Sequence, residues 1–164
     1  MHSTCNSRRV SSFVIASILL LGIGPPATSA GKARPFEVNF NKCFDRAGDA
    51  PYLFTFAGPA WGDVSGTLEA RVSVHIPGVE PNQTHIQADY VVAGALPFTA
   101  RVGGRINDRT KRAVLRGFVS EGPAWLIGAG VHDEFRDYVR ADGTPCSRGT
   151  LYVTPRWSQS HNDD

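Results

Sequence analysis

The densest group of ionisable side chains lies in the segment Trp125–Arg140, WLIGAGVHDEFRDYVR. A histidine beside carboxyl groups is typical of an acid–base or binding site, because imidazole titrates near neutral pH and burial tunes a carboxyl group. Whether these groups can act together depends on the element that carries them. The side chains in question are His132, Asp133, Glu134, Arg136 and Asp137.

Alternating residues predict that Trp125–Arg140 is one long β-strand with an apolar face and an opposite face that is first small and then charged. Successive side chains of a strand point to opposite sides, so Asp133 and Asp137 share the apolar face and His132 lies on the other. The group therefore cannot form one site. We expect the charged face to be an outer ladder that pairs with arginines of neighbouring strands, formed by His132, Glu134, Arg136 and Tyr138.

Asp133 and Asp137 are the positions at which the strand pattern breaks, because both stand where apolar side chains are expected. Two placements remain open. In the first, both carboxyl groups face the interior, where they would line any cavity as binding or proton-transfer groups. In the second, a bulge at Gly128 or Gly130 reverses the register and turns both toward solvent.

Aromatic residues recur in several segments and could line a pocket for a small apolar ligand or fill a solid core. A small barrel is just wide enough for either arrangement, and we favour the filled core. The candidate pocket residues are Trp61, Trp125 and Tyr90, accompanied by Tyr52, Phe54, Phe56 and Phe98.

Other groupings of chemically active residues are weak. His75 and His85 flank one turn and could approach each other, with Glu80 or Asp89 as a third ligand, but no HxH or HExxH spacing supports a metal site. The serines stand in no Gly-x-Ser-x-Gly context. We therefore assign no catalytic residue, no metal site and no cofactor from the sequence.

Residues 1–30 have the order of a secretory signal peptide. Arg8 and Arg9 precede an apolar run from Val10 to Ile23, and small residues follow up to Ala30. The run is short for a membrane-spanning helix, and we expect cleavage near Ala30. The sequence thus predicts an exported protein, periplasmic or extracellular, with residues 31–157 as one domain and 158–164 as a disordered polar tail.

The charge balance argues against two classes of partner. The whole chain has 17 basic and 15 acidic residues, and removal of residues 1–30 takes away Arg8 and Arg9 but no acidic residue. The remaining chain is formally neutral, whereas binding to nucleic acid or to a charged membrane surface needs a clustered basic excess. We expect no nucleic-acid partner and no membrane insertion after the signal is removed.

Cys43 and Cys146 remain after signal removal and lie near opposite ends of the mature chain. An oxidising compartment favours a disulfide between them, and closing so long a loop stabilises the fold by about 4–5 kcal/mol in the chain-entropy treatment. Two free thiols are the alternative, since spacing alone does not establish proximity.

Short alternating segments predict an all-β fold, and no stretch shows an apolar stripe with the period of a helix. An antiparallel meander of about eight strands removes its exposed edges by closing into a barrel. A β-sandwich is the alternative, although its crossings usually need longer loops. The expected strands are Phe36–Phe44, Tyr52–Ala57, Asp63–Ile76, His85–Ala93, Phe98–Ile106, Lys111–Val119, Trp125–Arg140 and Ser147–Thr154.

Glycine-led alternating strands give the chain a resemblance to small exported eight-stranded barrels of the calycin and allene-oxide-cyclase-like type. They are Gly62–Ile76, Gly117–Val119, Gly128–Phe135 and Gly149–Val153. The resemblance is one of pattern, and the Gly-x-Trp signature of lipocalins is absent because Trp61-Gly62 stands in the reverse order. It therefore assigns no functional residue.

Two functional hypotheses follow. The first is a non-enzymatic barrel that binds a small or apolar ligand or another component of the cell envelope. The second is a cyclase-like or isomerase-like enzyme with a proton-transfer group, Asp133 or His132, at the barrel mouth. A cavity that carries Asp133 or Asp137 beside aromatic residues would favour an interior function, whereas exposed aspartates around a solid core would leave only surface interactions.

Overall fold

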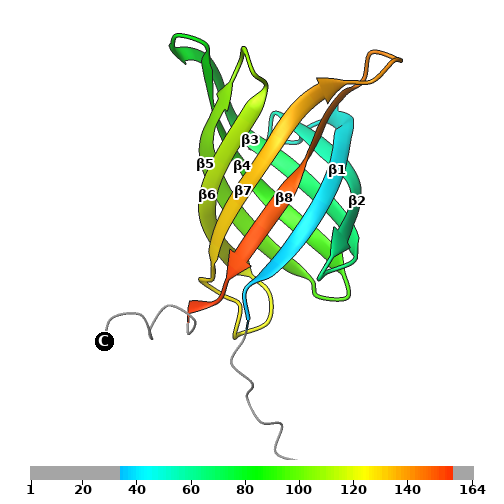
Figure 1. Ribbon diagram of the computed structural model, residues 1–164, viewed down its shortest axis with the longest axis vertical. Helices are drawn as coiled ribbons and strands as arrows, with labels where there is room; N and C mark the ends of the chain where they lie inside the picture. Colours follow the sequence, from blue (N-terminus) through cyan, green and yellow to red (C-terminus); the bar gives the residue numbers. More distant parts are fainter. Residues whose placement is uncertain (1–33, 157–164) are drawn as a thin grey trace, which may run out of the picture.

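The computed structural model describes residues 34–156 and shows a closed antiparallel β-barrel (Figure 1). Each strand pairs with the next one in the sequence, and β1 also pairs with β8. The predicted all-β meander closed into a barrel is confirmed, and the sandwich alternative is wrong. The strands are β1 (Phe36–Ala47), β2 (Phe54–Gly62), β3 (Gly66–Glu80), β4 (Gln83–Gly94), β5 (Phe98–Asn107), β6 (Arg112–Glu121), β7 (Gly130–Val139) and β8 (Pro145–Thr154).

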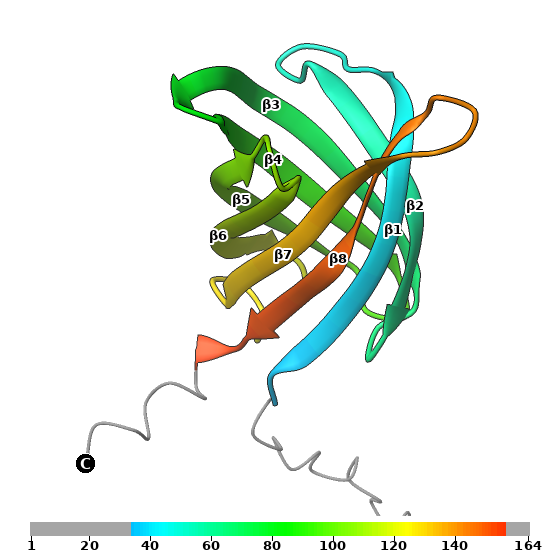
Figure 2. The same cartoon turned by 45° about the horizontal axis from the view of Figure 1, so that its top comes forward.

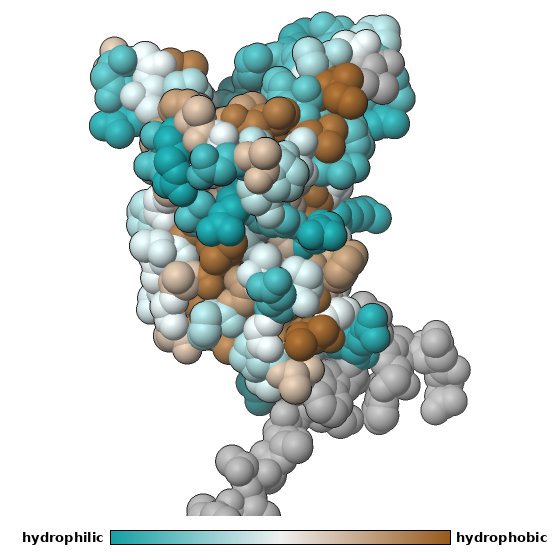
Figure 3. Space-filling view, turned by 180° about the vertical axis from the view of Figure 1, so that it is seen from behind, coloured by the Kyte–Doolittle hydropathy of each residue, from teal (hydrophilic) through white to brown (hydrophobic). Residues whose placement is uncertain are grey.

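The alternating sequence pattern determines which side chains fill the barrel. In β4, Ile86, Ala88, Tyr90 and Val92 are buried, while the residues between them are partly or fully exposed. Side chains of the other strands follow the same rule and join them in one hydrophobic core. On the face seen in Figure 3, hydrophilic residues dominate the upper half, toward one end of the barrel, and apolar residues form separate patches.

The two ends of the barrel differ. The connections β1–β2, β3–β4, β5–β6 and β7–β8 lie at one end, which we call the open end (Figure 2). The β6–β7 connection lies at the opposite, closed end (Figure 1). There Val64, Leu126 and Ala129 are almost completely buried in the core. Apolar packing thus fills the closed end.

The expectation of one long strand over Trp125–Arg140 is wrong in its first part, because β7 begins only at Gly130. Gly128 has a positive φ of 78°, and turn hydrogen bonds run from Leu126 N to Pro123 O and from Ala129 N to Leu126 O. These turn hydrogen bonds and the left-handed conformation of Gly128 interrupt the extended chain before Gly130. The turn leaves Trp125 exposed, although the strand pattern placed it on the inner face.

Two other strands differ from the predicted pattern. β2 does not end at Ala57, because Gly58 and Pro59 continue the ladder with β3. At Gly58 the strands β1 and β2 run so close that a Cβ would lie 2.0 Å from the carbonyl oxygen of Asn41, a contact that only glycine avoids. In β3, the register shifts between Val72 and Val74. This bulge reverses the side-chain alternation that the sequence showed up to Ile76.

The predicted disulfide between Cys43 and Cys146 is confirmed. It joins directly opposed residues of β1 and β8, beside the pair Lys42–Ser147. A disulfide fits an exported protein, because such bonds persist in oxidising compartments. The predicted signal peptide, residues 1–30, and the predicted tail, residues 158–164, lie outside the described residues. Within residues 34–156 there is no helix with the length and apolar character needed to cross a membrane.

Candidate functional site

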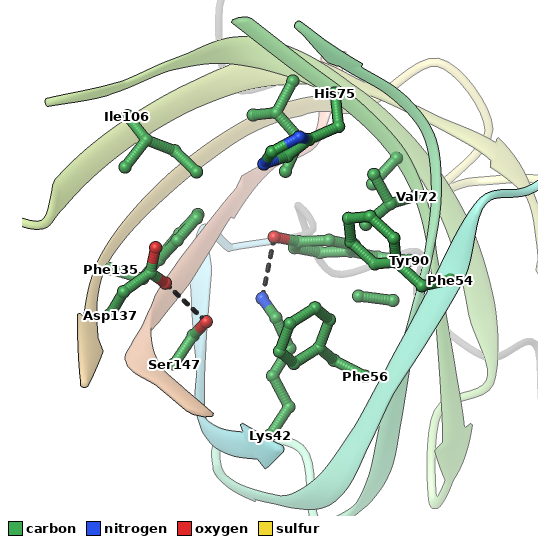
Figure 4. Close-up of a pocket in the computed structure, with 13 residues that line it drawn as sticks. Lys42, Phe54, Phe56, Val72, His75, Tyr90, Ile106, Phe135, Asp137 and Ser147 are labelled. Carbon is green, nitrogen blue, oxygen red and sulfur yellow. Dashed lines mark hydrogen bonds between the residues drawn. The ribbon is translucent and has the colours of Figure 1, made fainter. Parts of the chain in front are cut away.

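A cavity of about 100 Å³ occupies the barrel interior next to the open end (Figure 4). Most of its wall is built from large apolar side chains, among them Phe54, Phe56, Val72, Ile86, Ile106 and Phe135. Polar groups reach it from five strands and belong to Lys42, His75, Tyr90, Asp137 and Ser147. An apolar enclosure with a small number of convergent polar groups is the usual form of a small-molecule site.

A second hollow of about 310 Å³ adjoins the mouth of this cavity. It shares Phe56 and Asp137 with the cavity and is also lined by Lys111, Tyr138 and Pro145. A dry cavity of about 150 Å³ is enough to hold benzene. The inner cavity is smaller than this, so it takes one compact group, and a ring-sized molecule would extend into the outer hollow.

Lys42 is the cation of the site and comes from β1. The alternation that buries Val38 and Phe40 also points Lys42 inward, and its side chain is only 3 % exposed. Its Nζ lies 4.1 Å from the centre of the Phe40 ring, 4.3 Å from that of Tyr90 and 4.6 Å from that of Phe135. Three aromatic faces thus replace much of the water that would otherwise surround the ammonium group.

A chain of hydrogen bonds crosses the barrel from Lys42. Its Nζ donates to the Tyr90 hydroxyl over 2.9 Å, and that hydroxyl donates to Oδ2 of Asp133 over 2.7 Å. Asp133 is fully buried, and its other oxygen, Oδ1, has no hydrogen-bond partner. The three residues come from β1, β4 and β7, so only closure of the barrel brings them together.

Burial controls the ionisation of this chain. It lowers the pKa of the Lys42 ammonium to about 8, although the negative charges of Asp133 and Asp137 oppose the shift. It raises the pKa of Asp133 to about 6, against the opposing effects of Lys42 and the Tyr90 hydrogen bond. Burial also raises the pKa of Tyr90 well above its usual value, so the phenol stays protonated.

Asp137 lies four residues, two periods of the strand alternation, further along β7 toward the mouth than Asp133. Its Oδ1 accepts a hydrogen bond of 2.7 Å from the Ser147 hydroxyl, and both side chains line the cavity (Figure 4). Burial raises the pKa of Asp137, whereas Ser147 and Lys42 act in the opposite direction. The carboxyl group therefore stands at the boundary between the cavity and the outer hollow.

His75 reaches the cavity mouth because of the bulge in β3. Its ring centre lies 5.5 Å from that of Phe54 in an edge-to-face arrangement, and its side chain remains exposed on one side. In a regularly alternating strand over Asp63–Ile76, His75 would lie on the outer face. An extra residue before it reverses the alternation and turns the ring toward the cavity.

The structure places Asp133 and Asp137 inside the barrel, so the alternative in which a bulge turns both toward solvent is wrong. Asp137 and Tyr90 line the cavity. Asp133 does not line it, and is connected to it by the hydrogen bond from the Tyr90 hydroxyl. Trp61 and Trp125 are exposed by 44 % and 38 %, and neither is among the described residues that line the cavity.

The charged face of β7 lies outside the barrel as expected. His132 pairs with Glu134 of the same strand over 2.9 Å rather than with an arginine of a neighbouring strand. His75 and His85 lie on adjacent strands, β3 and β4. Within the described part of the chain, no group of three or more His, Cys, Asp or Glu residues is placed to hold a metal ion.

Sequence reasoning missed Lys42 and Ser147, and it considered His75 only as a possible metal ligand beside a turn. For Lys42 a signal was present, because it occupies the next inward position after Phe40 in an alternating strand. Ser147 was identified only as the first residue of the expected strand Ser147–Thr154 and was given no role. The sequence did not indicate that His75 points inward, because the bulge before it does not change the alternation of residue types.

No protein-family model, no curated protein and no solved structure matches this chain.

Proposed function

We propose that this protein is an exported, non-enzymatic barrel that binds one small, largely apolar molecule through its open end. The observation that carries the proposal is the cavity itself, in which aromatic and aliphatic side chains surround a small set of inward polar groups. The interior of an eight-stranded barrel is just wide enough to be filled by side chains or to hold one small ligand. Here only the closed end is filled.

The lining defines the kind of molecule that fits. Phe54, Phe56 and Phe135 offer ring faces and edges to an apolar group. Lys42 and Tyr90 at the base and Asp137 at the mouth offer hydrogen bonds to one or two polar atoms. A molecule of about one ring with a polar substituent fits the cavity and the outer hollow taken together.

Export is supported by two independent features. Residues 1–30 have the order of a secretory signal peptide, and the disulfide Cys43–Cys146 belongs to an oxidising compartment. The resemblance in strand pattern to calycin and allene-oxide-cyclase-like barrels agrees with a ligand-binding role but rests on pattern alone. A periplasmic or extracellular ligand is therefore the one to search for.

A binding experiment tests the proposal. Benzyl alcohol, titrated into the folded protein by calorimetry or NMR, is expected to bind and to shift the signals of residues around Phe56. Ala88→Leu places a larger side chain in the cavity wall and is expected to weaken binding by about tenfold or more. Ala93→Leu, an exposed change on the same strand, is the matched control and should leave affinity unchanged.

Equal binding by the wild type, Ala88→Leu and Ala93→Leu would place the ligand elsewhere and contradict the proposal. Ala88→Leu could also lower stability by overpacking. Ala70→Val, a smaller change in the same wall, then provides the same test at a lower steric cost. Native mass spectrometry of protein purified without denaturant would add the identity of any retained ligand.

The enzyme hypothesis has one observation in its favour, the continuous chain from Lys42 through Tyr90 to Asp133. Asp133 itself lies behind Tyr90, so a substrate in the cavity would meet Tyr90 and Lys42 rather than the carboxyl group. An isomerase would therefore transfer the proton through the Tyr90 hydroxyl. Exchange of deuterium from solvent into a bound carbonyl compound, lost in Tyr90→Phe, is the result that would support this second function.

A further inference from the structure

We propose that Lys42 captures small aldehydes by forming an imine in the cavity. The inference rests on the proposed binding function and adds to it the chemical class of the ligand and the atom that bonds to it. Lys42 lines the cavity, and its Nζ is held at the base by the Tyr90 hydroxyl, 2.9 Å away (Figure 4). A molecule that enters through the open end meets this nitrogen at the end of an apolar enclosure.

The surroundings of Lys42 favour a nucleophilic amine over a permanently charged group. Three aromatic rings surround Nζ, and the side chain is 3 % exposed. The groups that face it are Tyr90, Asp133 and Asp137, and the net effect lowers the pKa of the ammonium to about 8. About a quarter of the amine is then neutral at about pH 7.5, on the order of 100-fold more than for an unperturbed lysine.

The reaction needs nothing beyond the aldehyde and the protein. The lone pair of neutral Lys42 Nζ attacks the carbonyl carbon, a C–N bond forms, and the carbonyl oxygen takes up a proton to give a carbinolamine. Loss of the hydroxyl group with a proton from nitrogen then forms the C=N bond and releases one water. The Tyr90 hydroxyl contacts Nζ and can donate and recover the proton in both steps, with Asp133 as its acceptor.

Charge and shape select aldehydes over oxo-acids. Asp133 and Asp137 place two carboxyl groups near a single ammonium, so a ligand carboxylate would add a further negative charge to a desolvated space. Phe54 and Phe56 line the route to Nζ and suit an aromatic or branched aliphatic substituent. The ligand class is therefore a small, uncharged, apolar aldehyde.

Reductive trapping of benzaldehyde with cyanoborohydride tests the inference, with intact mass and peptide mapping as the readout. We expect one added benzyl group on Lys42, formed about tenfold or more faster than on the peptide that contains exposed Lys111. The Lys42→Arg variant should lose this adduct, and Arg109→Gln, an exposed change at a residue that lines neither hollow, should retain it. Ala88→Leu keeps the lysine but narrows the cavity, and it should slow the Lys42 reaction by about tenfold.

Benzyl alcohol has nearly the same shape as benzaldehyde but no carbonyl group. It therefore tests ligand binding separately from imine formation. Binding of benzyl alcohol without a Lys42 adduct from benzaldehyde would overturn the imine and leave the binding function intact. Absence of both would overturn the two together. Labelling of Lys42 and Lys111 at equal rates, or an undiminished rate in Ala88→Leu, would show a non-selective surface reaction and also overturn the inference.

Discussion

The Nζ of Lys42 donates a hydrogen bond to the hydroxyl of Tyr90, and the two atoms lie 2.9 Å apart inside the barrel. Because the same hydroxyl donates to Asp133, the phenol connects an ammonium and a carboxylate that have no direct contact in the described structure. A phenol between two charges keeps both hydrogen-bonded while leaving the nitrogen at the cavity wall. Stability, pH dependence and ligand preference all depend on this bridge.

Removal of the buried cation should destabilise the protein through the anion left behind. We expect Lys42→Met to lower the free energy of unfolding by about 3–5 kcal/mol near neutral pH, because Asp133 becomes an uncompensated buried charge. Lys42→Met combined with Asp133→Asn should regain most of that loss. Urea denaturation of the four members of this double-mutant cycle measures the coupling, and additive effects would contradict the bridge. Lys111→Met, on the surface, is the control and should change stability little.

The contribution of Lys42 and Asp133 to the free energy of unfolding should pass through a minimum between about pH 6 and pH 8. The pKa of Lys42 falls from 10.5 in the unfolded chain to about 8, so between these values the unfolded chain binds more protons and stability rises with pH. The pKa of Asp133 rises from 3.8 to about 6, so over that range the folded chain binds more protons and stability falls as pH rises. Each pKa shift changes the free energy of unfolding by about 3 kcal/mol between the unfolded and the folded pKa of the group.

The measurement for this pH effect is the difference in unfolding free energy between the wild type and the variant that carries both Lys42→Met and Asp133→Asn. That subtraction removes the titration of the other carboxyl groups. The difference should favour the wild type increasingly below about pH 6 and above about pH 8. A difference that stays constant with pH would show that neither group has a shifted pKa in the folded protein.

The disulfide should stabilise the barrel and keep the strands aligned beside the cavity. It closes a loop between residues separated by 103 positions. We expect Cys43→Ala combined with Cys146→Ala to lose up to about 4–5 kcal/mol of unfolding free energy. Because the pair Lys42–Ser147 is the next one along the ladder, amide exchange should increase there first. Unchanged exchange at Lys42 would show that the β1–β8 ladder alone holds this register.

The cavity should reject anions. At about pH 8 the carboxyl group of Asp133 is ionised and Lys42 is only partly charged, so a bound carboxylate meets a net negative interior. We expect benzoate to bind about tenfold or more weakly than benzyl alcohol, and Asp137→Asn should narrow this gap. His75→Gln is the control for the contribution of the imidazole ring at the mouth. Calorimetry measures the affinities for benzoate and for benzyl alcohol. Tighter binding of benzoate would mean that Lys42 dominates the field in the cavity.

The sequence predicted which strands carry the site better than it predicted which residues form it. The inward faces of β4 and β7 could be identified because alternation placed Tyr90, Asp133 and Asp137 among apolar residues. The same pattern failed for Trp125, because a turn around Gly128 interrupts what looks like one strand. It failed for His75, because a bulge reverses the alternation without altering the type of residue found there.

The sequence by itself predicted the all-β fold, and it favoured the closed barrel over a sandwich and the Cys43–Cys146 pairing over free thiols, because these depend on periodicity, strand number and the two cysteines outside the predicted signal peptide. Only the tertiary structure decided that Lys42, Tyr90 and Asp133 form one chain. They are 48 and 43 positions apart along the sequence, and no local pattern relates them. Closure and register bring their strands around a common interior, where the apolar surroundings supply the desolvation that shifts the pKa values of the lysine and the aspartate.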